Sequence, residues 1–218
     1  MDDVVYERQR DLHLAPPAET SIVGVGGVGA WVAIDLAMTG AKAINIFDSD
    51  VLEVHNLNRL PFTTDDIGKP KVQIVKDFIL KMRPDIKVIM NGNATEITKE
   101  LLRGSIVDCT DRVATQAFLQ EYCISNSLPY YRLGYDGHHM TVIDGSHPKA
   151  PRIKSVWDNG DGQEGYSTVP SWLVPPQIAA GLVTYMMCTP SRLAPVNMDI
   201  REIFDYAATK VDNGPKKK

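Results

Sequence analysis

The sequence lacks three features that would settle its class of protein at once. Its 3 cysteines, Cys109, Cys123 and Cys188, are too few and too widely spaced for a disulfide framework or a CxxC zinc pair. No run approaches about 18 uninterrupted apolar residues, and the opening residues lack the apolar segment of a secretory signal. We therefore expect reduced core thiols, a cytoplasmic location and no membrane association.

The chain also lacks an excess of positive charge. Its formal net charge is -4, which gives no general electrostatic attraction to nucleic acid, so we expect no nucleic-acid partner. With 218 residues, 44% of them hydrophobic, the chain is long enough for one α/β domain and short for two. We expect a single domain over residues 1–218, with a core at about 5–187 and a frayed tail at about 210–218.

Strand-like and helix-like segments alternate along the first two thirds of the chain. This alternation predicts a doubly wound, mostly parallel sheet of the Rossmann-like α/β class. The expected strands cover residues 21–25, 41–50, 86–92, 105–110 and 129–136, and the expected helices cover residues 26–40, 69–85, 98–104 and 113–127.

The alternation stops after the last of these strands. The pair Asp136-Gly137 stands between two strand-like runs and predicts an antiparallel hairpin. Residues of about 145–170 have few periodic apolar positions and many Gly, Pro and Asp, which predicts a long crossover loop. A final helix at about 175–187 is expected to pack back on the sheet.

The stretch GVGGVG follows the first strand and matches the pattern G-x-G-x-x-G through Gly24, Gly26 and Gly29. This pattern allows a tight turn, a close approach of backbone to phosphate and close helix packing. Gly27 adds a second position without a Cβ, which would let a phosphate chain come closer. Asp48, at the end of the second strand, is placed to accept hydrogen bonds from ribose hydroxyls. Both NAD and ATP fit these residues.

Polar residues beyond the strand ends favour a polyphosphate. Asn56, Arg59 and Lys71 follow the second strand, and two cations with an amide suit phosphate oxygens. Asp108 and Asp111 follow the fourth strand at the same edge of the sheet. We expect Asp111 to hold Mg²⁺ and Asp108 to be structural, because Mg²⁺ takes one or two carboxylates together with phosphate oxygens.

The segments GVGGVGA, DSDVLEVHNLNR, GKPK and DCTD, in this order, resemble the ThiF/MoeB/HesA family, the E1-like adenylating domains of ubiquitin-activating enzymes. The resemblance implies an adenylyltransferase that uses ATP and Mg²⁺. Its expected substrate is the C-terminal carboxylate of a small β-grasp protein, a ubiquitin-like or sulfur-carrier protein with a glycine tail. The products would be an acyl-adenylate and pyrophosphate.

The resemblance also implies roles for single residues. It places Asp48 on the ribose, Asn56 and Arg59 on the phosphates, Lys71 on ribose and phosphate, and Asp111 on Mg²⁺. The family's zinc cysteines are missing, so no zinc is expected.

The N-terminal YERQ is similar to a family motif whose arginine acts across a symmetric dimer. Here that arginine is Arg8, and a homodimer is implied.

Ser167 stands where thioester-forming members have a cysteine. Either adenylation proceeds without a thioester, or the serine replaces a natural cysteine; a serine without a base is a poor nucleophile.

Other readings of the same residues stay open. The glycine loop would also suit an NAD-dependent oxidoreductase, or a catalytically silent nucleotide-binding scaffold. Within the family, a tRNA-linked or small-molecule carboxylate could be the substrate. We interpret His138 and His139 as exposed turn residues, and Trp157 and Trp172 either as anchors of the long loop or as contacts for a partner's tail.

Overall fold

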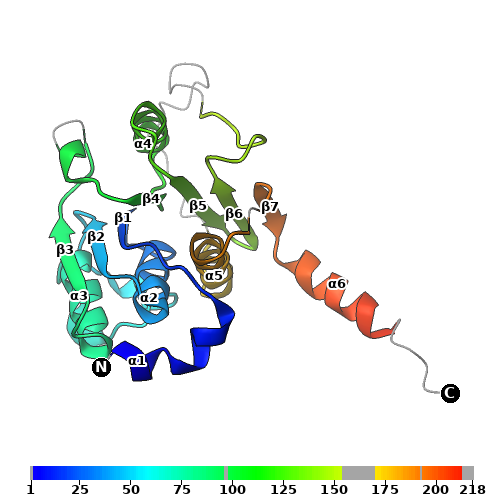
Figure 1. Ribbon diagram of the computed structural model, residues 1–218, viewed down its shortest axis with the longest axis horizontal. Coiled ribbons are helices and arrows are strands. Elements are labelled where there is room, and N and C mark those ends of the chain that lie inside the picture. Colours follow the sequence, from blue (N-terminus) through cyan, green and yellow to red (C-terminus); the bar gives the residue numbers. More distant parts are fainter. Residues whose placement is uncertain (1, 96–97, 154–169, 192, 213–218) are drawn as a thin grey trace.

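The computed structural model describes residues 2–95, 98–153, 170–191 and 193–212 (Figure 1). Its sheet has seven strands in the order β3-β2-β1-β4-β5-β6-β7. The first five of these are parallel, and the last two are antiparallel to their neighbours. The strands are β1 (Glu19–Val23), β2 (Ala43–Phe47), β3 (Lys87–Asn91), β4 (Ser105–Asp108), β5 (Tyr130–Asp136), β6 (His139–Asp144) and β7 (Val196–Asp199).

Helices cover both faces of the sheet. The larger core joins one face to α2 (Gly29–Thr39), α3 (Lys71–Met82) and α5 (Val174–Cys188), whereas a smaller core joins the other face to α4 (Val113–Ser125). Shorter or peripheral helices are α1 (Asp2–Val5), η1 (Glu7–Leu12), η2 (Val54–Asn56), η3 (Thr64–Asp66), η4 (Lys99–Leu101) and α6 (Arg201–Asp212). The doubly wound sheet, its hairpin and its final packed helix are thereby confirmed.

Local sequence explains where the central elements begin and end. β1 and β2 each bury four consecutive residues, as strands covered on both faces must. Gly40 ends α2 in the left-handed conformation at φ 113°, which glycine adopts without steric cost. α3 ends at Met82, two residues before Pro84. These ends lie within a few residues of those expected from the sequence.

The three cysteines are free thiols in the described fold. Cys123 and Cys188 are buried, and Cys109 is half-buried beside the end of β4. Burial raises the pKa of Cys123 to about 12 and that of Cys188 to about 11. These two thiols therefore stay protonated at neutral pH, as expected for core residues.

The N-terminal segment packs on the C-terminal end of α2. The Gln9 side chain donates a hydrogen bond of 2.8 Å to the Thr39 carbonyl. The ring of Tyr6 lies 4.6 Å from the Arg83 guanidinium in a cation-π contact, and Arg83 also donates to the Ala37 carbonyl at 2.9 Å. Because the helix carbonyls at this end lack intrahelical partners, these donors cap α2.

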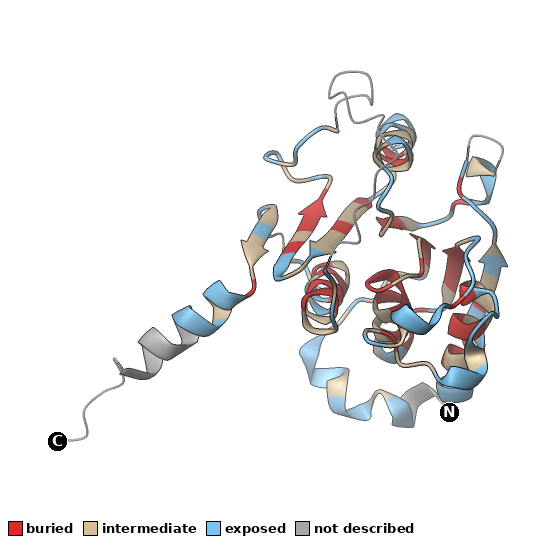
Figure 2. Cartoon of the chain, turned by 180° about the vertical axis from the view of Figure 1, so that it is seen from behind, coloured by how far each residue is buried: buried red, intermediate tan, exposed pale blue. Residues whose placement is uncertain are grey.

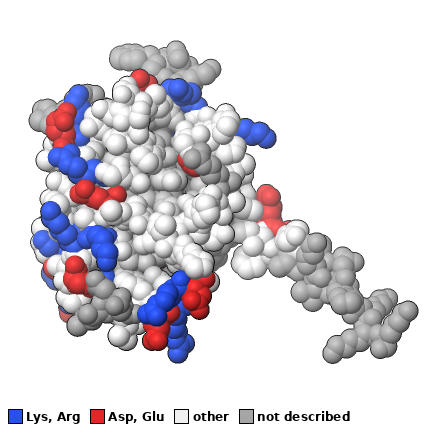
Figure 3. All heavy atoms as spheres, viewed as in Figure 1, with Lys and Arg blue, Asp and Glu red and all other residues white. Residues whose placement is uncertain are grey.

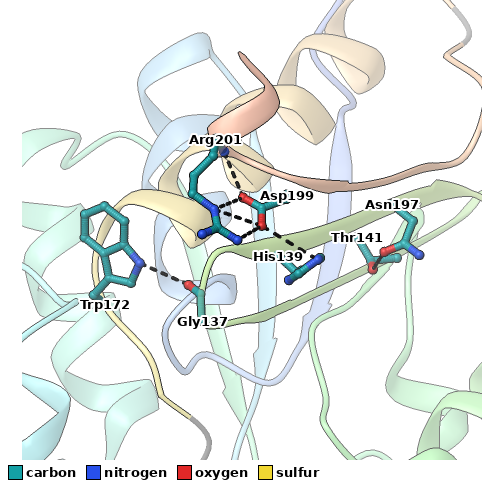
Figure 4. A network of polar contacts seen from close by, with 7 residues as sticks. All are labelled: Gly137, His139, Thr141, Trp172, Asn197, Asp199 and Arg201. Atoms are coloured by element: carbon teal, nitrogen blue, oxygen red, sulfur yellow. Dashed lines mark hydrogen bonds and ion pairs between the residues drawn. The ribbon is translucent and has the colours of Figure 1, made fainter. Parts of the chain in front are cut away.

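Two elements beyond residue 190 were not expected from the sequence. β7 pairs with β6, where the Thr141 hydroxyl lies 3.2 Å from Asn197 Oδ1, and Arg201 forms an ion pair with Asp199 next to His139 (Figure 4). α6 follows and projects away from the body of the molecule (Figure 2). The helix includes residues 210–212. Residues 213–218 lie outside the described part of the chain, so the frayed tail expected at about 210–218 stays a prediction.

Surface charges of both signs lie side by side on the face drawn in Figure 3, without a broad patch of one sign. This fits the near balance of acidic and basic residues in the sequence. Within the described ranges, none of the helices combines the length and the apolar character needed to cross a bilayer.

The fold predicts an unusual pH dependence of stability at Asp35 in α2. Burial raises the pKa of this carboxyl from 3.8 to about 6. The native state therefore binds the proton more tightly than the unfolded state, so stability falls as pH rises from about 4 to about 6. Asp35→Asn should remove this fall and increase the free energy of unfolding at pH 7 by roughly 1–3 kcal/mol.

Urea unfolding at pH 4 and pH 7 measures this effect. The matched control is Asp77→Asn on α3, because Asp77 is exposed. This variant should keep the pH dependence of stability of the unmodified chain. Equal pH dependence in the Asp35→Asn variant and the unmodified chain would contradict the assignment.

Candidate nucleotide site

The glycine loop between β1 and α2 depends on close backbone contacts. A Cβ on Gly24, whose φ is 85°, would lie 2.9 Å from the Cys109 carbonyl oxygen. A Cβ on Gly29 would lie 1.8 Å from the carbonyl oxygen of Gly24. Both glycines are therefore required for the loop to pack against the end of β4 and for α2 to begin there.

The two glycines between them have different surroundings. Around Gly26, a Cβ would meet nothing within 4 Å, so this side of the loop is open. At Gly27, a Cβ would lie 2.0 Å from the Tyr135 hydroxyl oxygen and 3.1 Å from Cδ of Arg59. From the sequence, we expected that Gly27 lacks a Cβ so that a phosphate can approach. In the structure, the place of that Cβ is taken by the side chains of Tyr135 and Arg59.

Asp48 joins the end of β2 to the glycine loop. Its Oδ2 accepts a hydrogen bond of 2.9 Å from the Val25 N–H, and its Oδ1 accepts one of 2.8 Å from the Asp50 N–H. The carboxylate thus holds the first turn of the loop, at the position where such folds bind a ribose.

Lys71 reaches the same corner from the start of α3. Its ammonium forms an ion pair of 2.9 Å with Asp50, and its backbone N–H donates to the Asp50 carbonyl at 2.9 Å. The lysine side chain is 11% exposed and that of the aspartate is 64% exposed. The Lys71 ammonium is therefore largely buried, and solvent reaches the ion pair from the side of the Asp50 carboxylate.

Arg59 approaches the loop from the turn after η2. Its Nη1 donates to the His55 carbonyl at 2.8 Å and to Oδ1 of Asn58 at 2.9 Å. Its Nε is buried and has no hydrogen-bond partner among the residues described. Because an unpaired buried donor is costly, this atom is suited to a phosphate oxygen brought to the loop.

Asn56 is buried within η2 rather than open to the loop. Its side-chain oxygen accepts a hydrogen bond of 3.1 Å from the Glu53 N–H and so closes a capping box. This contact holds the turn from which Arg59 extends. A contact between Asn56 and phosphate stays a prediction.

The two aspartates after β4 differ in their surroundings. Asp108 is fully buried, and it accepts hydrogen bonds of 2.7 Å from the hydroxyls of Tyr130 and Thr110. Burial raises the pKa of Asp108, while these bonds oppose that shift. Asp111 is exposed at the same edge, and its charge acts on the Tyr135 hydroxyl. This contrast supports a structural Asp108 and an accessible Asp111.

No group of three or more His, Cys, Asp or Glu residues suited to a metal ion occurs within the described part of the chain. Magnesium does not require such a group, because it is commonly held by one or two carboxylates together with phosphates and water. Asp111 at the open edge fits that manner of binding.

Arg8, one of the expected site residues, does not lie near the loop of its own chain. Arg8 is exposed in η1, and its neighbour Gln9 is bonded to Thr39, at the opposite end of α2 from the loop. With 11 residues, α2 is about 16 Å long. Ser167 lies outside the described residues, as does Trp157.

The expected crossover loop is anchored where its chain returns at residues 170–172. The Gly137 N–H in the hairpin turn donates to the Pro170 carbonyl at 2.7 Å, and Trp172 Nε1 donates to the Gly137 carbonyl at 3.0 Å. Asn58 donates to the Ser171 carbonyl at 2.8 Å. Trp172 is therefore an anchor of this segment, and its ring contacts that of His138. Both His138 and His139 are exposed, as expected.

Tyr135, Asn58 and Asp50 are the site residues that sequence reasoning missed. Asp50 and Asn58 lie within the segment DSDVLEVHNLNR but were given no role of their own, and Tyr135 lies in none of the quoted segments. Each of the three contacts a residue distant in the sequence or a motif residue. Asp50 offered one signal, because it stands two residues after Asp48 in the run DSD.

A cavity of about 670 Å³ lies elsewhere, between the C-terminal ends of α4 and α5 and the start of β5. Since β5 runs parallel to β1, the start of β5 is at the sheet edge opposite the glycine loop. Tyr130 lines this cavity and also bonds to Asp108. The cavity is separate from the candidate site.

A doubly wound sheet with a glycine loop, two cations and an exposed aspartate at its carboxyl edge has the arrangement of phosphate-binding α/β domains. The profile of the ThiF family matches residues 6–189, most of the chain. The chain belongs to the ThiF family. β7 and α6 follow the matched residues.

Among its relatives, the sulfur carrier protein ThiS adenylyltransferase of Escherichia coli is 28% identical over 152 residues, covering 65% of this chain and 59% of that protein. The tRNA threonylcarbamoyladenosine dehydratase of E. coli is 31% identical over 135 residues, covering 59% and 50%. The chain thus spans roughly half to three fifths of these relatives.

The crystal structure of E. coli MccB with MccA-N7isoASN has the same fold. The two align with a TM-score of 0.66 at 20% identity, over 84% of this chain and 64% of MccB. At this identity the likeness concerns the fold alone.

The geometry predicts opposite effects for two neighbouring glycines. Gly26→Ala should leave the free energy of unfolding within about 0.5 kcal/mol, because its Cβ meets open space and its φ is not positive. It should weaken ATP binding at least tenfold, about 1.4 kcal/mol, because the methyl group stands on the open side of the loop.

Gly24→Ala should instead destabilise the fold itself by roughly 1–3 kcal/mol through strain and the contact with Cys109. Calorimetric titration and urea unfolding of both variants measure the two effects. Unchanged ATP affinity in the Gly26→Ala variant would show that the phosphates do not bind on that side.

Proposed function

We propose that this chain is an ATP- and Mg²⁺-dependent adenylyltransferase that activates a carboxylate. The observation that carries the proposal is the buried, unpartnered Nε of Arg59 beside a glycine loop whose Gly26 side is open. Lys71 and Asp111 lie at the same carboxyl edge of the sheet. Two cations and a carboxylate suit a magnesium triphosphate better than the diphosphate of NAD.

In this proposal, each residue has a separate task. The loop N–H groups and Arg59 hold the phosphates, and Asp48 accepts from the ribose while it fixes the loop through Val25. Lys71 would contact ribose and phosphate after its partner Asp50 turns toward solvent. Asp111 would hold Mg²⁺, which offsets charge on the leaving pyrophosphate.

The reaction joins the carboxylate of the substrate to the α-phosphorus of ATP. A carboxylate oxygen forms the new bond to phosphorus, the α–β phosphoanhydride bond breaks, and pyrophosphate leaves with the electron pair. The positive groups around the loop stabilise the charge that develops during this exchange. The product is a mixed anhydride that a sulfur or nitrogen nucleophile can attack.

We propose the C-terminal carboxylate of a small β-grasp protein, with a glycine tail, as the substrate. A relative that is 28% identical carries the name of an adenylyltransferase for the sulfur carrier ThiS, which supports this choice. A tRNA-linked carboxylate is the second candidate, because another relative is named as a tRNA threonylcarbamoyladenosine dehydratase. Ser167 remains either an inert loop residue or the place of a nucleophilic cysteine.

The metal assignment is tested by Asp111→Asn. This change should reduce ATP–pyrophosphate exchange at least about 100-fold, because the carboxylate that would hold Mg²⁺ becomes a neutral amide. Stability should stay within about 0.5 kcal/mol, since Asp111 is exposed. Asp205→Asn on α6 is the matched control and should retain full exchange.

The same assay distinguishes the substrates. Exchange that needs an intact glycine tail on a β-grasp carrier supports the proposal, and exchange that needs tRNA with threonylcarbamoyladenosine supports the second candidate. Near-normal exchange in the Asp111→Asn variant would overturn the role of this residue in binding Mg²⁺.

We propose that Arg8 acts on the partner of a homodimer, because its YERQ segment is similar to the family motif that acts across a dimer and because Arg8 is exposed away from its own loop. Arg8→Ala and Asp111→Asn should each be inactive alone. A mixture refolded together should recover about a quarter of the original activity, because half of the dimers are mixed and each has one complete site. Pyrophosphate exchange of the mixture measures this recovery, and a mixture as inactive as its parts would exclude action across the dimer.

A further inference from the structure

Tyr135 places a hydroxyl group inside the glycine loop. It lies near the end of β5, and its ring packs against the larger core. A Cβ on Gly27 would lie 2.0 Å from the Tyr135 hydroxyl oxygen. That same Cβ would lie 3.1 Å from Cδ of Arg59. The tyrosine therefore fills the space that the glycine leaves free, beside the arginine.

The charges around this hydroxyl define its chemistry. Burial raises the pKa of Tyr135, the nearby Arg59 guanidinium lowers it by a smaller amount, and Asp111 raises it further. The phenol is therefore protonated at neutral pH and faces both charged residues. The charges of both the arginine assigned to the phosphates and the aspartate assigned to Mg²⁺ act on this hydroxyl.

The other contacts of Arg59 do not fix its Nε. Nη1 donates to the His55 carbonyl and to Oδ1 of Asn58, and the Arg59 carbonyl accepts a hydrogen bond of 2.9 Å from Trp31 Nε1. The side chain still needs support on the side of the loop. Tyr135 is the side chain that provides it at Gly27.

We propose that Tyr135 is a positioning residue, which holds the Arg59 guanidinium at the glycine loop so that it meets the phosphates of ATP. The consequence for ATP binding rests on the proposed function. The geometry rests on the packing of Tyr135 at Gly27 and on the side-chain hydrogen bond between Tyr135 and Arg59. It also explains Gly27: this position must lack a Cβ because the Tyr135 hydroxyl occupies that place.

Tyr135→Phe tests the role in phosphate binding, because it removes the hydroxyl and keeps the ring. Calorimetric titration should show about tenfold weaker binding of ATP, the effect of one lost hydrogen bond to a charged group. Binding of adenosine, which has no phosphate, should be unchanged. Tyr131→Phe is the matched control from the same strand and should leave both affinities unchanged.

A tyrosine that only supports the fold would weaken ATP and adenosine equally, and this result would overturn the inference. Unchanged ATP affinity in the Tyr135→Phe variant would also overturn it. If the unmodified chain binds no ATP, the proposed function and the role of Tyr135 toward ATP both fail. The packing test described next then decides only whether Tyr135 occupies the place at Gly27.

The packing test needs no nucleotide. Gly27→Ala should lower the urea midpoint clearly in the unmodified chain, because the new methyl group collides with Tyr135. In the Tyr135→Leu background the same change should lower the midpoint by less than half as much. An equal loss in both backgrounds would show that the tyrosine does not occupy this place.

Discussion

The close approach of backbone segments at the end of β1 is the constraint on which the candidate site depends. Gly24 lies against the Cys109 carbonyl after β4, and Gly29 lies against the Gly24 carbonyl. Neither position has space for a Cβ, so the loop must turn sharply and α2 must begin directly above it. The N-terminal N–H groups of α2 thus meet the edge where three parallel strands end.

The residues assigned to ATP are arranged around this turn by contacts from separate elements. Asp48 extends from β2 and bonds to the loop at Val25, and Lys71 begins α3 and bonds to Asp50. The Arg59 carbonyl accepts from Trp31 on α2, so the turn that carries the arginine is fixed to the helix that the loop starts. A shift of the loop would therefore also disturb Asp48 and Arg59, two of the residues assigned to ATP.

Much of this could be predicted from sequence, because strand and helix periods and glycine spacing are local signals. The order of the central elements and the hairpin at Gly137 are examples. β7 escaped prediction because Val196 and its neighbours become a strand through pairing with β6, which no local pattern reveals. Tyr135 was not predicted for a related reason. Its role depends on a contact with Gly27, which is more than 100 residues away in the chain.

The proposed function depends on which nucleotide the loop binds, since the glycine spacing alone suits ATP and NAD equally. Its most direct test is a thermal-shift titration of the unmodified chain with ATP and Mg²⁺, and in parallel with NADH. ATP with Mg²⁺ should raise the melting temperature in a concentration-dependent manner, and NADH should not raise it. Protection by NADH without protection by ATP would contradict it.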